Sequence, residues 1–213
     1  MLYAIQNNDP FPPVHLSQSD GLLAVGGSLT RQRLLDAYKR GIFPWYEGKY
    51  PMWWCPDPRF VLFPDELVIS KSMKQLLKRK AFEFRYNTAF AEVISNCKQV
   101  KRKLQESTWI TDEVEQAYND LHEAGIAVSA EVWQDGKLVG GLYGIRMGKV
   151  FFGESMFSKV SNASKYAFIC YVDQLKKEGV ELIDCQVYTE HLESLGARML
   201  SRNDFTARLK QLI

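Results

Sequence analysis

Two polar side chains interrupt an apolar segment near the C-terminal end of the chain. Asp184 and Gln186 lie in the run VELIDCQV (180–187), which has the residue types of a buried strand. The period of two in a strand puts both on one face. Leaving either unpaired costs about 1–3 kcal/mol, so each must bond to the other, to another protein group, to water or to a ligand. The pair therefore predicts either a satisfied core network or a functional site.

A third ionisable side chain stands among aromatic residues. Glu154 follows Gly153 in the run KVFFGESMF (149–157), which otherwise has the pattern of a buried strand. A glycine inside a strand often marks a bulge, and a glutamate in such a place is a candidate for chemistry. The alternative is an edge residue that faces water.

Cysteine and histidine spacing suggests neither a zinc site nor a disulfide framework, and it argues against a catalytic histidine. No CxxC pair is present, and no histidine lies at ligand spacing from a cysteine. No histidine is accompanied by both a nucleophile and an orienting carboxylate. We therefore expect core or surface roles for all of these residues: Cys55, Cys97, Cys170, Cys185, His15, His122 and His191.

Basic charge is concentrated in the middle third, although the net charge is only +2. A helix beginning at Ser70 would put Met73, Leu76 and Leu77 on one side and the lysines on the other. This pattern fits a solvated helix face or a surface that contacts the phosphates of a nucleic acid. The residues concerned are Lys71, Lys74, Lys78, Arg79 and Lys80, with a second cluster at Lys98, Lys101, Arg102 and Lys103.

The elements that carry these residues predict an α+β chain with two domains, 1–64 and 65–213. The first part is rich in proline, glycine and tryptophan, with one helix capped by Ser28 or Thr30 and ended by Gly41. The second part has the order of an acetyltransferase-like fold, with a mixed, largely antiparallel sheet and a buried central helix. Its expected segments are a helix that starts near Asn87, a helix over 111–125, antiparallel strands over 126–133, 137–146 and 149–157, a helix over 163–178 capped by Asn162, and a strand over 180–187.

The location predicted for the chain is the cytoplasm. The first residues have no basic region followed by an apolar core, and every apolar run is too short to span a bilayer.

Nine segments, in this order and spacing, resemble the leucyl/phenylalanyl-tRNA–protein transferase family. They are GLLAVGGSL, LLDAYKRGIFPW, WWCPDPR, STWIT, EVW, LVGGLYG, FFGESMFS, NASK and LIDCQV. The resemblance extends from about Gly21 to Gly196. It implies transfer of leucine or phenylalanine, with methionine as a further candidate donor, from charged tRNA to the α-amine of proteins that begin with arginine or lysine. Such proteins become substrates of N-end rule degradation, and no metal or organic cofactor is implied.

The resemblance also implies roles for particular residues. The catalytic carboxylate and its glutamine partner fall on Asp184 and Gln186, and the glutamate of the family motif falls on Glu154. Trp45 and Trp109 fall on positions associated with gripping the 3′-terminal adenosine. The slot for the leucyl or phenylalanyl side chain falls on Leu142, Phe151, Met156, Phe168, Tyr171 and Ile183.

Such a sparse site suits aminoacyl transfer. An α-amine has a pKa of about 7.7–8, so a useful fraction is neutral at pH 7, and the tRNA ester is already activated. The enzyme must orient the amine and relieve it of a proton, which Asp184 acting through Gln186 would do. Glu154 would hold the substrate ammonium or position the attacking amine.

Two other classes remain as alternatives. A coenzyme A dependent N-acyltransferase would share the fold, but its pyrophosphate loop is glycine-rich, whereas the corresponding loop here, SKVSNASK (158–165), has no glycine. A non-catalytic tRNA-binding protein would explain the basic residues but not Asp184, Gln186 and Glu154.

Overall fold

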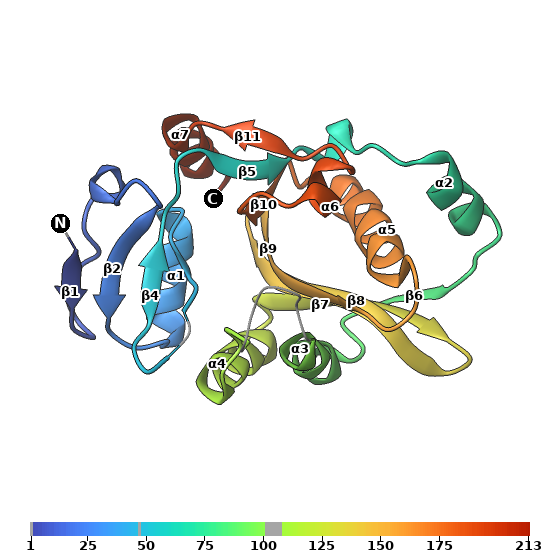
Figure 1. Ribbon diagram of the computed structural model, residues 1–213, viewed down its shortest axis with the longest axis horizontal. Coiled ribbons are helices and arrows are strands. Elements are labelled where there is room, and N and C mark those ends of the chain that lie inside the picture. The colour runs from blue at the N-terminus through green and yellow to red at the C-terminus, as the bar shows by residue number, and fades with distance from the viewer. Residues whose placement is uncertain (1, 47, 101–107) are drawn as a thin grey trace.

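Two sheets organise the chain. The computed structural model describes residues 2–46, 48–100 and 108–213, so three members of the second basic cluster, Lys101, Arg102 and Lys103, lie outside the described residues. The strand orders are β1-β2-β4-β3 in the smaller sheet and β11-β5-β10-β9-β8-β7-β6 in the larger one. The two sheets lie at different ends of the molecule in Figure 1.

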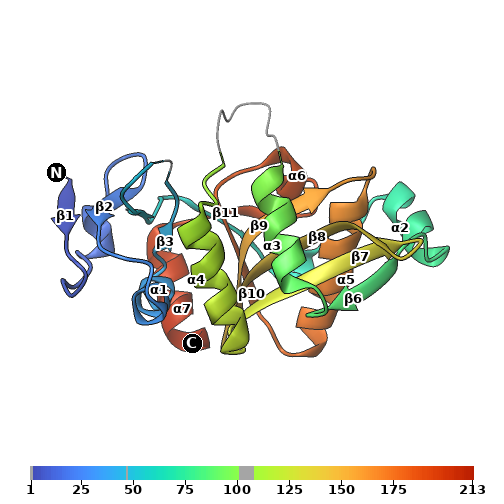
Figure 2. The same cartoon turned by 90° about the horizontal axis from the view of Figure 1, so that it is seen from below.

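The smaller sheet carries the first helix against it. Thr30 caps this helix, because its side chain accepts a hydrogen bond from the Arg33 amide, and Gly41 follows its end with a φ of 77°. The predicted helix is thus confirmed, with Thr30 and not Ser28 as its cap. In Figures 1 and 2 the helix lies between the small sheet and the larger part. The elements are β1 (Tyr3–Ile5), η1 (Val14–Leu16), β2 (Leu22–Gly26), α1 (Arg31–Lys39), β3 (Phe43–Pro44) and β4 (Met52–Trp54).

The larger sheet is mixed but mostly antiparallel. Among the described strand pairs of this sheet, only β9 and β10 run parallel. The predicted α+β class and sheet type are confirmed. One strand, β5, falls within the range predicted for the first domain but pairs in this sheet, and a division near residue 64 stays a prediction. The strands are β5 (Arg59–Leu62), β6 (Glu83–Tyr86), β7 (Ala127–Gln134), β8 (Lys137–Met147), β9 (Val150–Ser158), β10 (Leu182–Gln186) and β11 (Arg198–Leu200).

Helices cover both faces of the β7 and β8 region. The buried helix α5 (Ala163–Lys177) packs on one face, while α3 (Phe90–Gln99) and α4 (Asp112–Glu123) pack on the other, as Figures 1 and 2 show. The central buried helix is therefore confirmed. The remaining helices are η2 (Pro64–Glu66), α2 (Lys71–Lys78), α6 (Glu190–Glu193) and α7 (Arg202–Leu212). No helix in the described ranges is long and apolar enough to cross a membrane.

One helix begins slightly later than expected, and one predicted cap was wrong. The helix expected near Asn87 is present as α3, which begins at Phe90, while Asn87 itself precedes it with a φ of 53°. The strand β6, which precedes it, was not predicted. Asn162 does not cap α5 through its side chain, since its φ is 66°. Instead the Ser158 hydroxyl accepts a hydrogen bond from the Ser164 amide at 3.3 Å.

Candidate active site

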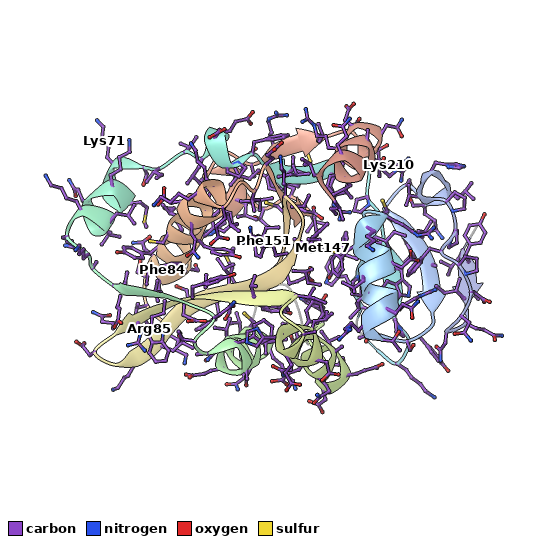
Figure 3. The ribbon with its side chains drawn as sticks, turned by 180° about the vertical axis from the view of Figure 1, so that it is seen from behind. Lys71, Phe84, Arg85, Met147, Phe151 and Lys210 are labelled. Carbon is purple, nitrogen blue, oxygen red and sulfur yellow. The ribbon has the colours of Figure 1, made fainter. Side chains whose placement is uncertain are left out.

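A cavity of about 500 Å³ lies between β8, β9, β10 and the start of α5, with α6 at its edge. Its lining includes the three predicted polar residues, Glu154, Asp184 and Gln186. In Figure 3, Phe151 lies in the interior between the sheet and α5. The cavity is also lined by five of the six residues predicted for the side-chain slot: Leu142, Phe151, Met156, Phe168 and Ile183.

The sixth predicted slot residue, Tyr171, supports the cavity wall without lining it. Its side chain is buried, with an exposed fraction of 1%. The Tyr171 ring meets the ring of Phe151 edge-on at 5.0 Å and stacks on Tyr86 at 5.5 Å. Tyr171 therefore holds Phe151 from behind.

A bulge in β9 directs Glu154 out of the regular ladder. The pairing of β8 with β9 passes from Tyr143 opposite Ser155 to Gly144 opposite Gly153, so Glu154 is the extra residue. Of the two features that a glycine inside a strand can mark, a bulge or a close backbone approach, the structure has a bulge next to Gly153. The Glu154 side chain is only partly exposed, which contradicts the alternative of an edge residue in water.

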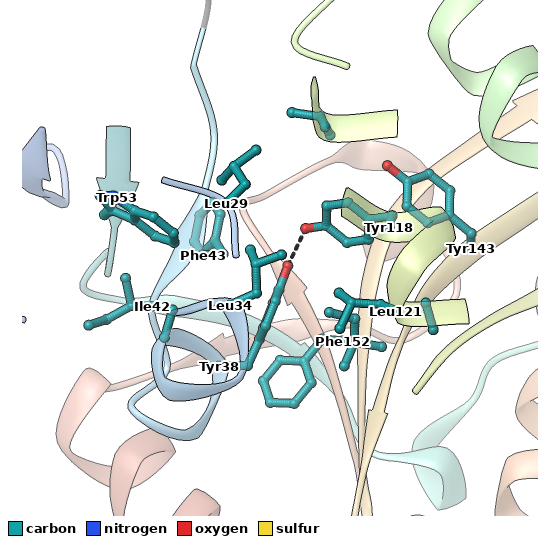
Figure 4. Packing of buried hydrophobic residues seen from close by; sticks show 14 of the residues in the cluster. Leu29, Leu34, Tyr38, Ile42, Phe43, Trp53, Tyr118, Leu121, Tyr143 and Phe152 are labelled. Atoms are coloured by element: carbon teal, nitrogen blue, oxygen red, sulfur yellow. Dashed lines mark hydrogen bonds between the residues drawn. The ribbon is translucent and has the colours of Figure 1, made fainter. Parts of the chain in front are cut away.

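Three side chains from three elements hydrogen-bond the Glu154 carboxyl. The Tyr38 hydroxyl of α1 lies 2.8 Å from Oε1, the Tyr118 hydroxyl of α4 lies 2.9 Å from Oε2, and Gln186 Nε2 donates to Oε1 at 2.9 Å. The two tyrosine hydroxyls are themselves 2.5 Å apart, and Figure 4 shows them meeting where α1 faces α4. The site thus draws on the small N-terminal unit as well as on the larger one.

The surroundings of Glu154 favour its neutral form. Burial is the main cause that raises its pKa from 4.5 to about 7, and the nearby Asp184 charge adds to the rise. The hydrogen bonds from Tyr38, Tyr118 and Gln186 act in the opposite direction but do not cancel it. Burial likewise raises the pKa of both tyrosines well above their ordinary value, so they remain protonated hydroxyls.

Asp184 is held by a buried ion pair. Arg59 Nε and Nη2 donate to its two carboxylate oxygens at 2.8 and 2.7 Å, and both side chains are fully buried. Burial is the largest single effect on the Arg59 pKa and lowers it, but the charge and the hydrogen bonds of Asp184 act together in the opposite direction, and the net shift is upward. The guanidinium also lies over the rings of Phe43 and Phe205, at 4.6 and 4.7 Å. Asp184 is therefore fixed in place from the β5 side.

The prediction that Asp184 and Gln186 project from one face of a regular strand was wrong. The register of β10 against β5 shifts between these two residues, and Gln186 has a φ of 62°. Asp184 Oδ1 accepts a hydrogen bond from the Gln186 main-chain amide at 2.9 Å, while the Gln186 carboxamide reaches Glu154. Asp184 thus shapes the backbone that presents Gln186.

Cys185 lies between them and also lines the cavity. Burial raises the pKa of its thiol well above the ordinary range, so very little thiolate forms near neutral pH. None of the cysteines in the described ranges forms a disulfide. In the described ranges, no group of three or more His, Cys, Asp or Glu side chains is arranged to hold a metal ion.

Neither tryptophan predicted to grip the terminal adenosine lines the cavity. Trp109 is 5% exposed and belongs to the hydrophobic core, so its ring faces are covered in this structure. Trp45 is partly exposed, and its ring lies 5.6 Å from that of Trp54. A role for either in binding adenosine stays a prediction.

The amphipathic helix predicted from Ser70 is confirmed as α2. Ser70 caps it, Met73 is buried, and Leu76 and Leu77 are partly buried against the core. In Figure 3, Lys71 points away from the body of the molecule, far from Phe151. The predicted tRNA-binding residues Lys71, Lys74, Lys78, Arg79 and Lys80 are all exposed.

Sequence reasoning missed Tyr38, Tyr118 and Arg59. Tyr38 and Arg59 belong to two of the segments that carry the family resemblance, LLDAYKRGIFPW and WWCPDPR, so their positions carried a signal that was not used. Tyr118 follows Val114 at helical spacing and looks like an ordinary core residue.

Comparison with known proteins gives consistent results over nearly the whole chain. The family profile described as leucyl/phenylalanyl-tRNA protein transferase matches residues 61–210, and the profile of the N-terminal domain of the same enzyme matches residues 27–57. A leucyl/phenylalanyl-tRNA–protein transferase of Flavobacterium johnsoniae is 60% identical over 201 residues, which cover 94% of this chain and 95% of the relative. Its counterpart in Christiangramia forsetii is 55% identical over 207 residues, or 96% and 98% of the two chains.

Solved structures show a more distant likeness. A GCN5-related N-acetyltransferase-like protein from Streptococcus suis is similar over 80% of this chain and 64% of its own, with 10% sequence identity and a TM-score of 0.41.

Proposed function

The chain belongs to the leucyl/phenylalanyl-tRNA–protein transferase family and transfers an aminoacyl group from tRNA to protein, and we propose that this transfer takes place in the cavity lined by Glu154, Asp184 and Gln186. The observation that carries the proposal is the meeting of two features in one cavity. Part of the lining is apolar and suits a leucyl or phenylalanyl side chain, and the rest offers polar groups.

The acceptor is the α-amine of a protein that begins with arginine or lysine, and the product enters N-end rule degradation. The amine nitrogen attacks the ester carbonyl, so a C–N bond forms and the bond from the carbonyl carbon to the ribose oxygen breaks. The nitrogen loses one proton and the ribose oxygen gains one. No cofactor takes part in this exchange.

Gln186 positions the attacking amine. Its carboxamide nitrogen is engaged by Glu154, which leaves the carboxamide oxygen as the group that accepts an N–H from the amine. Such a hydrogen bond points the nitrogen lone pair at the ester and draws charge from the N–H as the C–N bond forms. Gln186 is 8% exposed and lines the cavity, which suits a group that touches substrate.

Asp184 acts on this step through the backbone. Because both of its oxygens bond Arg59, its carboxylate is committed to a buried ion pair. Its hydrogen bond to the Gln186 amide stabilises the turn in β10 that presents the carboxamide. Asp184 is therefore a positioning residue.

The transfer is direct. The thiol of Cys185 is the cysteine nucleophile nearest to the polar residues in sequence, and its raised pKa keeps it protonated. Among the described residues that line the cavity, Cys185 is the only cysteine that could form a covalent aminoacyl-enzyme.

The rest of the donor binds outside the cavity. The basic face of α2 meets phosphates of the tRNA acceptor stem, because its side chains are exposed and positively charged. Trp45 and Trp109 hold the terminal adenosine, for which the Trp109 side chain has to expose one ring face when tRNA binds.

A direct assay tests this function. The protein is incubated with leucyl-, phenylalanyl- or methionyl-tRNA and with peptides that differ only in the first residue, arginine, lysine or alanine, and products are identified by mass spectrometry. We expect transfer to the arginine and lysine peptides and none to an arginine peptide with an acetylated amine. Acetyl transfer from acetyl coenzyme A in place of tRNA-dependent transfer would contradict the proposal.

A further inference from the structure

Glu154, Tyr38 and Tyr118 form a closed ring of hydrogen bonds. The ring has three oxygen-to-oxygen contacts, which are Tyr38 to Glu154 Oε1 at 2.8 Å, Tyr118 to Glu154 Oε2 at 2.9 Å, and Tyr38 to Tyr118 at 2.5 Å. Each contact needs one hydrogen atom between its two oxygens. The two tyrosines supply two hydrogens, so the ring lacks one if Glu154 is ionised.

A protonated Glu154 supplies the missing hydrogen in one consistent arrangement. Oε1 already accepts from Gln186, so the proton belongs on Oε2. Oε2 then donates to Tyr118, Tyr118 donates to Tyr38, and Tyr38 donates to Oε1. With an ionised Glu154, both tyrosines donate their hydrogens to the carboxylate. No hydrogen is then left to lie between the hydroxyl oxygens of Tyr38 and Tyr118.

On this basis, and resting on the function proposed above, we propose that Glu154 is a neutral carboxylic acid in the working enzyme. We assign Tyr38 and Tyr118 as positioning residues that, through Glu154, aim the Gln186 carboxamide at the acceptor amine.

The charges around the ring agree with this assignment. The groups that face Glu154 are Tyr38 of α1, Tyr118 of α4 with Tyr143 of β8 behind it, and Asp184 of β10. Arg59 of β5 is bound to Asp184 through both carboxylate oxygens. Within residues 2–46, 48–100 and 108–213, no Lys, Arg or His forms an ion pair with Glu154. An ionised Glu154 would thus be a largely buried charge beside a second anion.

Neutrality matters because of the acceptor. In water at pH 7 an α-amine, with a pKa of about 7.7–8, is mostly the unreactive ammonium. A carboxylate in the cavity would stabilise that ammonium and hold it in an ion pair. A neutral Glu154 gives no such stabilisation, so the amine that reaches Gln186 is in its nucleophilic form. Glu154 therefore does not bind the ammonium, one of the two roles that the sequence left open.

The variant Glu154→Gln tests the ring. A glutamine amide has one acceptor and one donor group, the same pattern as the carboxylic acid, so it can keep every contact. Wild-type transfer should decline at alkaline pH as Glu154 ionises. In Glu154→Gln, transfer at pH 6.5 should stay within roughly tenfold of wild type and the alkaline decline should disappear. At each pH, the transfer rate of Glu154→Gln is divided by that of wild type. The titration of the acceptor amine and the hydrolysis of the tRNA ester affect both proteins equally, so they do not change this ratio.

Glu154→Ala and Tyr118→Phe complete the series. Alanine removes both the donor and the acceptor, so transfer should fall at every pH while the affinity for charged tRNA holds. Tyr118→Phe removes a donor that stabilises the ionised carboxyl, so the alkaline decline should move to higher pH. A purely structural role for Tyr118 would lower the rate without moving the profile.

Infrared difference spectra of wild type against Glu154→Gln give a readout independent of activity. The carbonyl stretch of a protonated carboxyl should be present at pH 6 and absent at pH 9. A carboxylate signal at pH 6, or a loss of more than about 100-fold in Glu154→Gln at every pH, would overturn the proposal. If the wild-type protein transferred no aminoacyl group at any of the pH values tested, the proposed function itself would be contradicted.

Discussion

Arg59 Nη2 and Asp184 Oδ2 lie 2.7 Å apart, and both side chains have no solvent exposure. A fully desolvated pair of this kind loses stability when one partner is removed, because the other charge is left buried. This relationship separates two ways in which a substitution at Asp184 can reduce activity. One acts on the fold, and the other acts on the presentation of Gln186.

Arg59→Met should therefore lower the free energy of unfolding by about 3–5 kcal/mol, measured by urea denaturation. The double variant Arg59→Met with Asp184→Leu should regain a large part of that loss, since no buried charge remains. If the two single losses simply add in the double variant, the pair is not coupled. Arg40→Met is the matched control, because Arg40 and its partner Asp36 are exposed and their pair should contribute less than about 1 kcal/mol.

Gln186→Ala should lower the turnover of the acceptor by roughly 100-fold while the affinity for charged tRNA stays the same. The reason is that Gln186 contacts the amine and Glu154, not the nucleic acid. Asp184→Asn should show a similar loss of transfer but also a lower midpoint of unfolding, since it weakens the pair with Arg59. Near wild-type turnover in both variants would rule out the assigned roles.

The order of elements was predictable because most of them carry local signals. Asp135-Gly136 marks the hairpin between β7 and β8, and both residues have positive φ, at 52° and 72°. Thr30 and Ser70 mark helix starts, and Gly153 marked the bulge at Glu154. The strand β6 was missed because its pairing partner, β7, begins 41 residues after β6 ends, and such pairing leaves no local trace.

The site was predictable as a set of residues but not as a set of contacts. The resemblance located Glu154 and Gln186. The prediction assumed a regular alternation of side chains in β10, however, and so wrongly placed Asp184 and Gln186 on the same face. A register shift separates them, and Asp184 is bound at that point by Arg59, which lies 125 residues earlier in the chain. Tyr38 and Tyr118 reach Glu154 only because α1 packs beside α4, and no spacing rule connects such distant positions.

The pH dependence of stability provides a check on Glu154 that needs no substrate. Its pKa is 4.5 when unfolded and about 7 when folded, so between these values the folded state binds more protons than the unfolded state. Stability contributed by this group is therefore greatest at low pH and falls as the pH rises from about 4.5 to about 7, by at most about 3 kcal/mol.

Glu154→Gln removes this dependence, so the stability difference between variant and wild type should grow in favour of the variant over that range and level off above it. Urea denaturation at a series of pH values measures the difference. Glu123→Gln, at an exposed position, is the control and should show no such trend. A difference that is constant with pH would mean that Glu154 is ionised throughout.

Met156→Ala should enlarge the apolar part of the cavity. Met156 lines it together with Phe151 and Phe168. Removing its side chain should weaken binding of the leucyl group and favour bulkier donors, with a change in the ratio of kcat/KM values equivalent to about 1–3 kcal/mol. Competition between leucyl-tRNA and phenylalanyl-tRNA measures this ratio. Met199→Ala, in which the replaced side chain is 46% exposed on β11, should leave the ratio unchanged. An unchanged ratio in Met156→Ala would place the side-chain slot elsewhere.

The last prediction separates the two halves of donor recognition. Lys74 and Lys78 are exposed on α2, and the lysine face of this helix points away from the body of the molecule, as Lys71 shows in Figure 3. Phosphate contacts release counterions, so they carry the salt dependence of binding. The double variant Lys74→Ala with Lys78→Ala should bind charged tRNA more weakly and with a salt slope reduced by about 2, because two phosphate contacts are lost.

The same double variant should use a minimal aminoacyl-adenosine donor almost as well as wild type does, since that donor is too short to reach α2. The control is Lys39→Ala with Lys210→Ala, two exposed lysines on α1 and α7 that change the net charge by the same amount. If the control variant flattens the salt dependence equally, the effect comes from net charge and not from a site on α2. Equal losses on the two donors would mean that Lys74 and Lys78 support the fold or the cavity, and the electrostatic assignment of α2 would then be wrong.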